Sequence, residues 1–251
     1  MNARQKQIYE YITANAQVTI AELEALCSNV SRMTISRDLQ SLEQDGVLVR
    51  THGGARSISS LSQPSEEVYT SRANENVEQK NEIVQKAAQI IHAGSPVYID
   101  AGSTAMYLAR CLPQQRLYIT TSGPNIAMEL VKTGTFAVNL LGGELNPDTI
   151  SVSGARSIEC INSINIDTAF IVASGYSDEA GFTNGNNNEC ALKRAALARA
   201  RNRVVMMDSS KIGKTLPFTF AKAADISMLI TDSGISDELR RSFEAQGVEV
   251  I

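Results

Sequence analysis

The chain has 251 residues, of which 43% are hydrophobic, and a net charge of −4. This length suits one small and one medium domain with a real hydrophobic core, and the N-terminus has no long apolar run that would predict a signal peptide or a membrane span. The negative charge lies after residue 60, because residues 1–60 hold six basic and six acidic residues, so the later part is not expected to track nucleic acid.

The first predicted element is a short helix that begins after Thr19. Glu22 follows three residues later, which is the spacing of a capping box. Val18 precedes the cap and can pack on Leu23 as a hydrophobic staple. Apolar residues at helical spacing continue this pattern until Ser28-Asn29, which we expect to end the helix.

A second helix is predicted from Ser31, which can serve as its N-cap. Ile35, Leu39 and Leu42 fall on one face of this helix, so its other side chains point away from the core. A helix-turn-helix places the first turns of its second helix in the major groove of DNA. The side chains predicted to contact DNA from this helix are Ser31, Arg32, Met33, Thr34, Ser36 and Arg37.

A small β-hairpin, or wing, is predicted after Gly46, a residue that is well placed to end the second helix. Residues 47–49 read as a strand, and the glycine pair that follows reads as the turn. Basic side chains on such a wing can reach the phosphate backbone. The predicted wing contacts are Arg50, His52, Gly53, Gly54 and Arg56.

The alternative for residues 19–56 is a helical subdomain that only packs on another part of the protein. The polar outer face of the second helix and the arginine-bearing hairpin favour DNA binding instead. Because residues 1–60 carry no net charge, specific contacts and dimerisation would have to supply much of the affinity for DNA.

Residues 34–55 closely resemble the signature of the DeoR-type bacterial transcriptional regulators; they read TISRDLQSLEQDGVLVRTHGGA. The family pattern is roughly T-I-R-R-D-L, then L-E, then G, then R-x-H-G-G-A. The departure is Ser36, where the family commonly has Arg. Because a missing guanidinium removes a phosphate or guanine contact, the operator sequences of relatives are not expected to transfer to this chain.

A Ser-rich stretch near residues 56–70 predicts a linker. We therefore expect a winged helix-turn-helix domain over 1–57, a linker over 58–72, and an effector-binding and oligomerisation domain over 73–251. A helix is predicted over 74–93, after which apolar strands alternate with helices. This alternation predicts an α/β fold with a mainly parallel sheet. The predicted strands are 97–100, 117–121, 136–143, 169–174, 203–208, 226–232 and the last four residues, and further helices are predicted near 188–201 and 236–246.

Polar residues follow the ends of the predicted strands, and ligands of open α/β sheets bind outside those carboxyl ends. A Gly-Ser-Thr turn that opens a helix offers N–H groups and hydroxyls to an anion. Lys193 or Lys211 can complete the charge, and acidic side chains can accept hydrogen bonds from hydroxyls. The pattern predicts a pocket for a phosphorylated sugar or polyol, with the candidate residues Asp100, Gly102, Ser103, Thr104, Thr121, Ser122, Gly142, Gly143, Glu189, Lys193, Asp208 and Lys211.

The second half also resembles the DeoR effector domain, whose fold is similar to ribose-5-phosphate isomerase and which typically binds phosphorylated sugars. The matching segments are DAGST (100–104), the glycine pair 142–143, GFT (181–183) and DSSK (208–211). Lys80 also sits where relatives often carry Lys. The departure is Ser122-Gly123 in place of Asn-Ser. The amide-rich stretch 184–189 is either a substrate-specific loop or a hairpin tip.

These features predict a transcriptional regulator, most simply a repressor of a sugar or polyol operon. Its expected partners are double-stranded DNA, a phosphorylated sugar-type effector and further copies of itself, as a dimer or tetramer. The alternative is a sugar-phosphate isomerase-like enzyme with an appended DNA-binding module, for which Asp178-Glu179 is the candidate acidic pair. We expect no catalysis, because the two histidines, His52 and His92, do not fall at the predicted pocket.

The four cysteines are far apart in sequence and form neither a CxxC motif nor a Cys/His pair. This spacing predicts no metal site and favours a reduced, cytoplasmic setting. No cofactor and no membrane association are expected.

Overall fold

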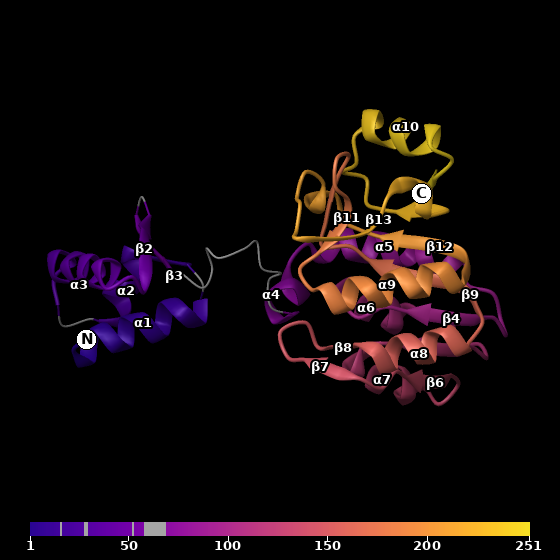
Figure 1. Ribbon diagram of the computed structural model, residues 1–251, viewed down its shortest axis with the longest axis horizontal. Coiled ribbons are helices and arrows are strands. Elements are labelled where there is room, and N and C mark those ends of the chain that lie inside the picture. The colour runs from indigo at the N-terminus through magenta and orange to yellow at the C-terminus, as the bar shows by residue number, and fades with distance from the viewer. Residues whose placement is uncertain (16, 28–29, 52, 58–68) are drawn as a thin grey trace. The chain divides into compact units, whose positions relative to one another are not determined.

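The computed structural model describes residues 1–15, 17–27, 30–51, 53–57 and 69–251 (Figure 1). The chain divides into two compact units, Met1–Ser65 and Glu66–Ile251. No helix in the described ranges is long and apolar enough to cross a membrane.

The first unit is a winged helix-turn-helix. Its three strands form an antiparallel sheet in the order β1-β3-β2. The helices bury their apolar faces on one another and on this sheet, in a core that includes Ile8, Ile12, Leu23, Ile35, Leu39, Leu42 and Leu48. The elements are α1 (Ala3–Asn15), β1 (Gln17–Thr19), α2 (Ile20–Leu26), α3 (Arg32–Gln44), β2 (Leu48–Thr51) and β3 (Gly54–Ser57).

The predicted helix caps of this unit are confirmed. Thr19 and Glu22 form the capping box at the start of α2, with the backbone N–H of Thr19 donating to Glu22 Oε2 over 2.7 Å. The Ser31 hydroxyl caps α3 by accepting from the N–H of Thr34. Gly46, with a φ of +69°, follows Asp45, the C-cap of α3. Helix α1 and strand β1 were not among the predicted elements.

The wing differs from its prediction at one glycine. Gly54 is not a turn residue but the first residue of β3, where it pairs with Thr19 and Thr51. A Cβ atom on Gly54 would lie 1.9 Å from the carbonyl oxygen of Val18. The close approach of β1 therefore requires glycine at this position. Because β1 runs directly into α2, its pairing with β3 joins the wing to the start of α2.

The second unit is built on a seven-stranded sheet in which every strand pair is parallel (Figure 1), so the predicted sheet is confirmed. The strand order is β15-β14-β12-β9-β4-β5-β6. The strands are β4 (Pro96–Ile99), β5 (Tyr118–Thr121), β6 (Ala137–Leu140), β9 (Ile166–Val172), β12 (Ala200–Met206), β14 (Met228–Ile230) and β15 (Glu249–Val250).

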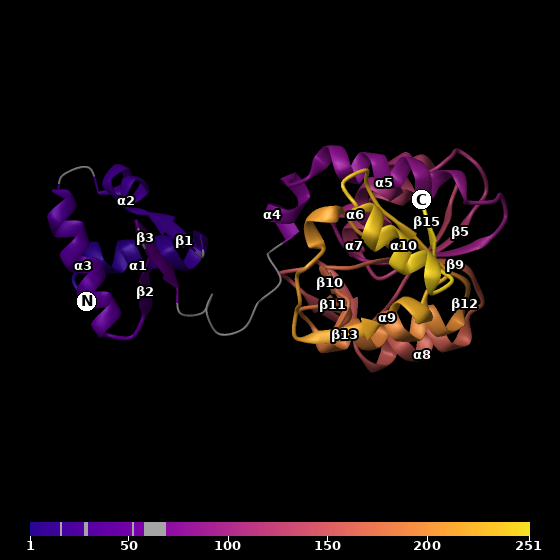
Figure 2. The same ribbon diagram turned by 90° about the horizontal axis from the view of Figure 1, so that it is seen from above.

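Helices cover both faces of this sheet and divide its core in two (Figure 2). One apolar cluster lies under α5 (Val77–Gln89), α6 (Ser103–Cys111) and α7 (Pro124–Leu130). The other lies under α8 (Ala155–Ser163), α9 (Asn187–Arg199) and α10 (Asp237–Ala245). The sheet is thus buried on both sides, as is usual for parallel strands.

Two smaller antiparallel sheets were not predicted. One is the hairpin of β7 (Glu144–Asn146) and β8 (Ser151–Ser153). The other joins β10 (Gly175–Ser177), β11 (Gly181–Asn184) and β13 (Phe218–Ala221). The β7–β8 hairpin follows β6 and the β10–β11 hairpin follows β9, so both extend from the carboxyl edge of the large sheet.

The predicted boundaries after the first unit need correction. The predicted linker 58–72 overlaps a helix, α4 (Tyr69–Asn74). The predicted helix 74–93 is shorter, because α5 covers Val77–Gln89 and is preceded by Asn76 in a left-handed conformation. A left-handed residue cannot continue an α-helix, so the two helices are separate.

The substitution Gly54→Ala tests the close approach in the wing. The added methyl group should push β3 from β1 and cost about 1–3 kcal/mol of the stability of the first unit. This loss of stability is measured on the full chain, as faster hydrogen exchange of amides in the buried core of the first unit. Val49→Ala, an exposed position on β2, is the control and should change stability by no more than about 0.5 kcal/mol. Equal protection in Gly54→Ala and the parent would contradict the steric argument.

Candidate effector site and DNA-binding surface

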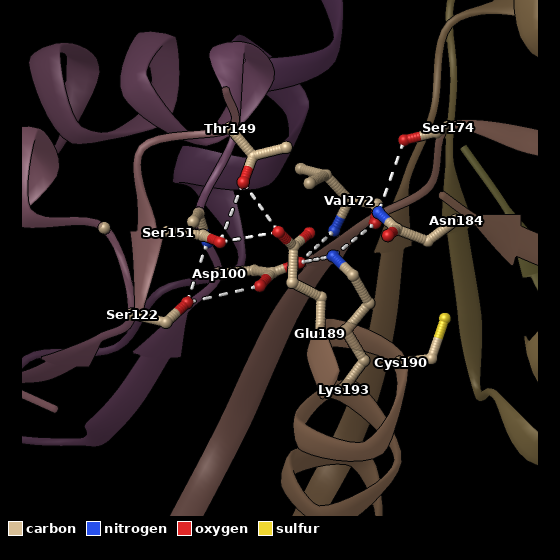
Figure 3. Close-up of polar contacts among 12 residues, drawn as sticks. Asp100, Ser122, Thr149, Ser151, Val172, Ser174, Asn184, Glu189, Cys190 and Lys193 are labelled. Carbon is tan, nitrogen blue, oxygen red and sulfur yellow. Dashed lines mark hydrogen bonds and ion pairs between the residues drawn. The ribbon is translucent and has the colours of Figure 1, made fainter. Parts of the chain in front are cut away.

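A buried ion pair lies at the carboxyl edge of the large sheet (Figure 3). The Nζ of Lys193, from α9, contacts Oδ2 of Asp100, the residue that follows β4. Both side chains are almost completely buried. Val172 at the end of β9 completes the arrangement, since its N–H donates to Asp100 Oδ2 over 3.1 Å and its carbonyl accepts from Lys193 over 3.0 Å. The pair therefore ties two central strands to α9.

The second oxygen of Asp100 faces β5. The hydroxyl of Ser122, just after β5, lies 3.4 Å from Asp100 Oδ1. The same oxygen of Ser122 accepts from the hydroxyl of Tyr98 over 3.0 Å and from the N–H of Ala101 over 3.1 Å. Burial raises the pKa of Tyr98 well above its ordinary value, so Tyr98 remains a proton donor to Ser122.

Glu189 fastens the β7–β8 hairpin to the start of α9 (Figure 3). Its Oε1 accepts from the hydroxyls of Thr149 and Ser151, each over 2.6 Å. The amide of Asn146 lies 3.3 Å from the same oxygen. Asn186 caps α9 by accepting from the N–H of Glu189. The carboxylate predicted to bind ligand hydroxyls thus binds hydroxyls of the protein.

The Gly-Ser-Thr turn opens α6 beside Val172. Gly102 has a φ of +146°, and a Cβ atom there would lie 2.7 Å from the side chain of Val172. Glycine is therefore required for the helix to start so close to β9. Ser103 and Thr104 are buried in the first turn of α6.

The neighbouring predicted residues of this edge are also placed. Thr121 is fully buried, and its hydroxyl accepts from the N–H of Gly123. Gly142 and Gly143 follow β6 and are exposed. A Cβ on Gly143 would lie 2.3 Å from the carbonyl oxygen of Ser153, so this glycine is explained by the approach of β8.

The Asp208 turn lies at the end of β12. Asp208 accepts from the N–H of Ser210, and its Oδ1 also lies 3.2 Å from the side-chain amide of Asn76. Lys211 is half-buried in the same turn. Lys80 of α5 is buried, and desolvation lowers its pKa. Since these residues follow β12 and the Asp100 group follows β4 and β5, the structure brings the predicted candidates to one edge of one sheet.

Several side chains at this edge were not among the candidates; they include Asn76, Tyr98, Asn146, Thr149, Ser151 and Asn184. Asn184 is buried, and its amide lies 3.5 Å from the hydroxyl of Ser174. Thr149 and Ser151 belong to the hairpin that periodicity missed. The signal that pointed nearest to them was the amide-rich stretch 184–189, which forms the end of β11 and the start of α9.

The predicted DNA-contacting residues of α3 lie on its outer side, whereas Gly54 of the wing is buried against β1. Ser31, Arg32, Met33 and Arg37 are exposed, and Thr34 and Ser36 are partly exposed. Asp38, on the opposite side, is buried and bonded to Arg4 of α1 over 2.5 Å.

The guanidinium of Arg50 donates to the Ser36 hydroxyl over 3.3 Å, which joins the wing to α3. Gly53 is exposed at the base of β3. His52 lies outside the described residues, and for Arg56 only the backbone, in β3, is described.

The acidic pair considered for catalysis and the histidine outside the wing are also placed. Asp178 and Glu179 form the exposed turn between β10 and β11, where Asp178 accepts from the hydroxyl of Tyr176. His92 lines a cavity of about 230 Å³ with Asn202 and Glu249, near the amino ends of the strands. Among the described residues, no three His, Cys, Asp or Glu side chains are grouped to hold a metal ion.

Comparisons with known proteins identify both units. The family described as "DeoR-like helix-turn-helix domain" matches residues 4–61, and the one described as "DeoR C terminal sensor domain" matches residues 75–233. The chain is 33% identical to the HTH-type transcriptional regulator GolR of Listeria innocua, over 98% of this chain and 96% of that protein. It is 31% identical to the lactose phosphotransferase system repressor of Streptococcus mutans, over 95% and 94% of the two chains.

Solved structures give a more distant likeness. Ribose 5-phosphate isomerase A from Methanocaldococcus jannaschii matches with a TM-score of 0.41 and 15% identity, over 55% of each chain. The translation initiation factor eIF-2B from Pyrococcus horikoshii matches with a TM-score of 0.46 and 14% identity, over 94% of this chain and 85% of that one. Because the two family matches cover both units and the relatives match nearly end to end, the chain belongs to the DeoR family and is a DNA-binding transcriptional regulator.

Proposed function

We propose that this regulator is a cytoplasmic repressor of a sugar or polyol catabolic operon and that a phosphorylated sugar-type effector controls its binding to DNA. The observation that carries the proposal is the set of buried acidic, basic and hydroxyl side chains gathered at the carboxyl edge of the large sheet. Ligands of open α/β sheets bind at this edge.

The charges of the edge favour one position for a phosphate group. Lys193 already compensates Asp100, so this pair offers an incoming anion little net attraction. Gly102, Ser103 and Thr104 begin α6, and the N–H groups of a helix start attract anions. Lys211 is the lysine proposed to add a positive charge. The phosphate is therefore placed against the start of α6, on the side of Lys211.

The hydroxyls of the effector are proposed to bind Glu189 and Asp100. In the structure these carboxylates accept from the hydroxyls of Thr149, Ser151 and Ser122. A polyol presents the same chemical group, so it can replace these internal donors without leaving a buried carboxylate unpaired. Such replacement makes binding depend on hydroxyl positions.

Catalysis is not proposed. The Asp178–Glu179 pair of the enzyme alternative lies in an exposed turn, and the relatives matched over nearly the whole chain are transcriptional regulators.

The effector site is tested by Ser103→Glu, which places a carboxylate where the phosphate is proposed to bind. This variant should hold DNA and ignore the effector, because the two negative charges repel. The readout is a DNA-release titration with ribose 5-phosphate, fructose 6-phosphate and glycerol 3-phosphate, each beside its unphosphorylated parent. The DNA is a fragment selected from a random pool by the parent protein.

Because Ser103 is buried, a second variant protects the test against misfolding. Lys211→Ala should fold as the parent does, bind DNA equally well, and need roughly 10- to 100-fold more of the active phosphosugar for release. Equal release by phosphorylated and unphosphorylated compounds, or an unchanged response in both variants, would disprove the placement of the phosphate.

The DNA surface is tested by Arg37→Ala. Arg37 is exposed in the first half of α3 and lies off the buried stripe of that helix. Its loss should cost on the order of 1–3 kcal/mol in affinity for the selected fragment at fixed salt. Gln44→Ala, at the last residue of α3, is the matched control and should bind as the parent does. Parent-like binding by Arg37→Ala would show that another element reads the DNA.

Self-association is proposed to use the β6 edge of the large sheet. β6 is the last strand of the order and pairs only with β5 among the described strands. Large exposed apolar side chains gather near it on β5, α7, the 3-10 turn after α7, β6 and β7, and such patches mark interfaces; they are Tyr118, Met128, Val131, Leu140 and Leu145.

A second copy of the chain is the occupant proposed for this edge. Two β6 strands can pair antiparallel about a two-fold axis, which matches one edge to itself and closes the assembly as a dimer. A dimer also presents two winged helices, and one such module reads too few base pairs for genomic specificity.

Leu140→Lys tests this edge. Sedimentation equilibrium of the parent at micromolar concentration should give at least twice the 27.1 kDa mass of the chain. The variant should sediment with half the mass of the parent or less, because pairing would bury two unpaired charges. Ala198→Lys, which adds the same charge to an exposed position on α9, should keep the parent mass. A monomeric parent, or a variant with the parent mass, would rule out the β6 edge.

A further inference from the structure

Helix α4 is the first described element of the chain after the wing, so it is where the effector unit begins. Its first residue is held by the β7–β8 hairpin. The N–H of Tyr69 donates to the carbonyl oxygen of Asp148 over 2.7 Å. Asp148 directly precedes Thr149, whose hydroxyl is bonded to Glu189. Two hydrogen bonds, one to Asp148 and one from the adjacent Thr149, therefore link the start of α4 to Glu189, a carboxylate proposed to bind the effector.

The other end of α4 is held by Asn76. This residue has left-handed backbone angles, φ +48° and ψ +43°. Its side-chain amide donates to Asp208 Oδ1 over 3.2 Å and to the Ser210 hydroxyl over 2.9 Å. Asn76 is therefore bonded directly to the turn that carries Lys211.

Two further contacts fix the body of α4. The buried Nζ of Lys80 donates to the carbonyl oxygens of Arg72 and Glu75, at the end of α4 and just beyond it. The hydroxyl of Tyr107 donates to the carbonyl of Ala73 over 3.3 Å. Tyr107 lies on α6, whose first turn is the proposed phosphate position. These two anchors come from α5 and α6, and α6 also carries the proposed phosphate position.

We propose that α4 is the coupling element between the effector site and the DNA-binding unit, and that Asn76 is the positioning residue that joins it to the Asp208 turn. This inference rests on the proposed function. An effector whose hydroxyls replace Thr149 and Ser151 at Glu189 alters the anchor of Tyr69. An effector whose phosphate draws on Lys211 alters the anchor of Asn76.

A ligand shifts a conformational equilibrium only through contacts that differ between its two states. The anchors of α4 supply such contacts. The β7–β8 hairpin holds α4 and is bonded to Glu189. The Asp208 turn is bonded to Asn76 and carries Lys211. In chain order, α4 is the first described element after the wing, and the proposal is that a change in its anchors is transmitted along the chain to the DNA-binding unit.

Asn76→Gly removes the amide while keeping a residue that tolerates left-handed angles, so the backbone turn is retained. Asn74→Ala is the control, because the side chain of Asn74 is exposed and its amide donates to the carbonyl of Thr70 within α4 itself. Hydrogen exchange on the full chain needs neither effector nor operator. Amides of residues 69–74 should exchange at least about tenfold faster in Asn76→Gly and at the parent rate in Asn74→Ala. Unchanged exchange in Asn76→Gly would overturn the anchoring role.

The coupling itself is measured with the phosphosugar that binds the parent best among ribose 5-phosphate, fructose 6-phosphate and glycerol 3-phosphate. For the parent, the factor by which this compound weakens binding of the selected DNA fragment should lie within about 5–150. By linkage, the DNA should weaken binding of the compound by the same factor. In Asn76→Gly both factors should fall to within about twofold of one, while the Kd of the compound without DNA changes by less than about threefold.

The outcomes separate the two proposals. If none of the three compounds binds the parent, the proposed effector class is wrong and the exchange experiment alone decides the role of α4. If the compound binds and releases DNA from Asn76→Gly as it does from the parent, the coupling role of α4 is overturned. It is also overturned if Asn76→Gly loses binding of the compound itself, because Asn76 would then act in the site and not through α4.

Discussion

The buried ion pair of Asp100 and Lys193 is the interaction on which the sensor unit depends. It binds the end of β4 to α9 and, through the backbone of Val172, to the end of β9. Removing one partner of a buried pair leaves an uncompensated charge and costs about 3–5 kcal/mol. The pair therefore fixes the relative positions of two central strands and one helix, and the hydroxyls of Ser122, Thr149 and Ser151 are arranged around that fixed frame.

The fold could be predicted where the sequence signal was long and local. Buried parallel strands form continuous apolar runs, so the alternation of strands and helices predicted the large sheet. The hairpins β7–β8 and β10–β11 were missed because their strands have three or four residues, too few to establish a period of two. Helix α1 was missed because, among its side chains whose burial is described, the fully buried apolar ones are Ile8 and Ile12, too few to define a helical stripe.

The site could be predicted as a set of residues and not as a set of contacts. Polar residues after strand ends converge on one edge in any parallel sheet, which is why Asp100 and Ser122 could be expected at that edge, whereas Glu189 and Lys193 reach it from the first turns of α9. That Lys193 pairs with Asp100 depends on where α9 crosses the sheet. That Asn76 reaches Asp208 depends on a single left-handed residue. Neither distance has a signature in local sequence.

The pairing of β4 with β9 has a consequence for folding. Val97 pairs with Thr168, so the partners are 71 positions apart in the chain, and forming such distant contacts is slow. The winged helix-turn-helix instead closes over shorter stretches of chain, and β2 pairs with β3, the next strand in sequence. During synthesis the first unit can fold while the strands that complete the sensor are still unmade. A newly made chain therefore gains the fold that reads DNA before it gains the fold that senses an effector.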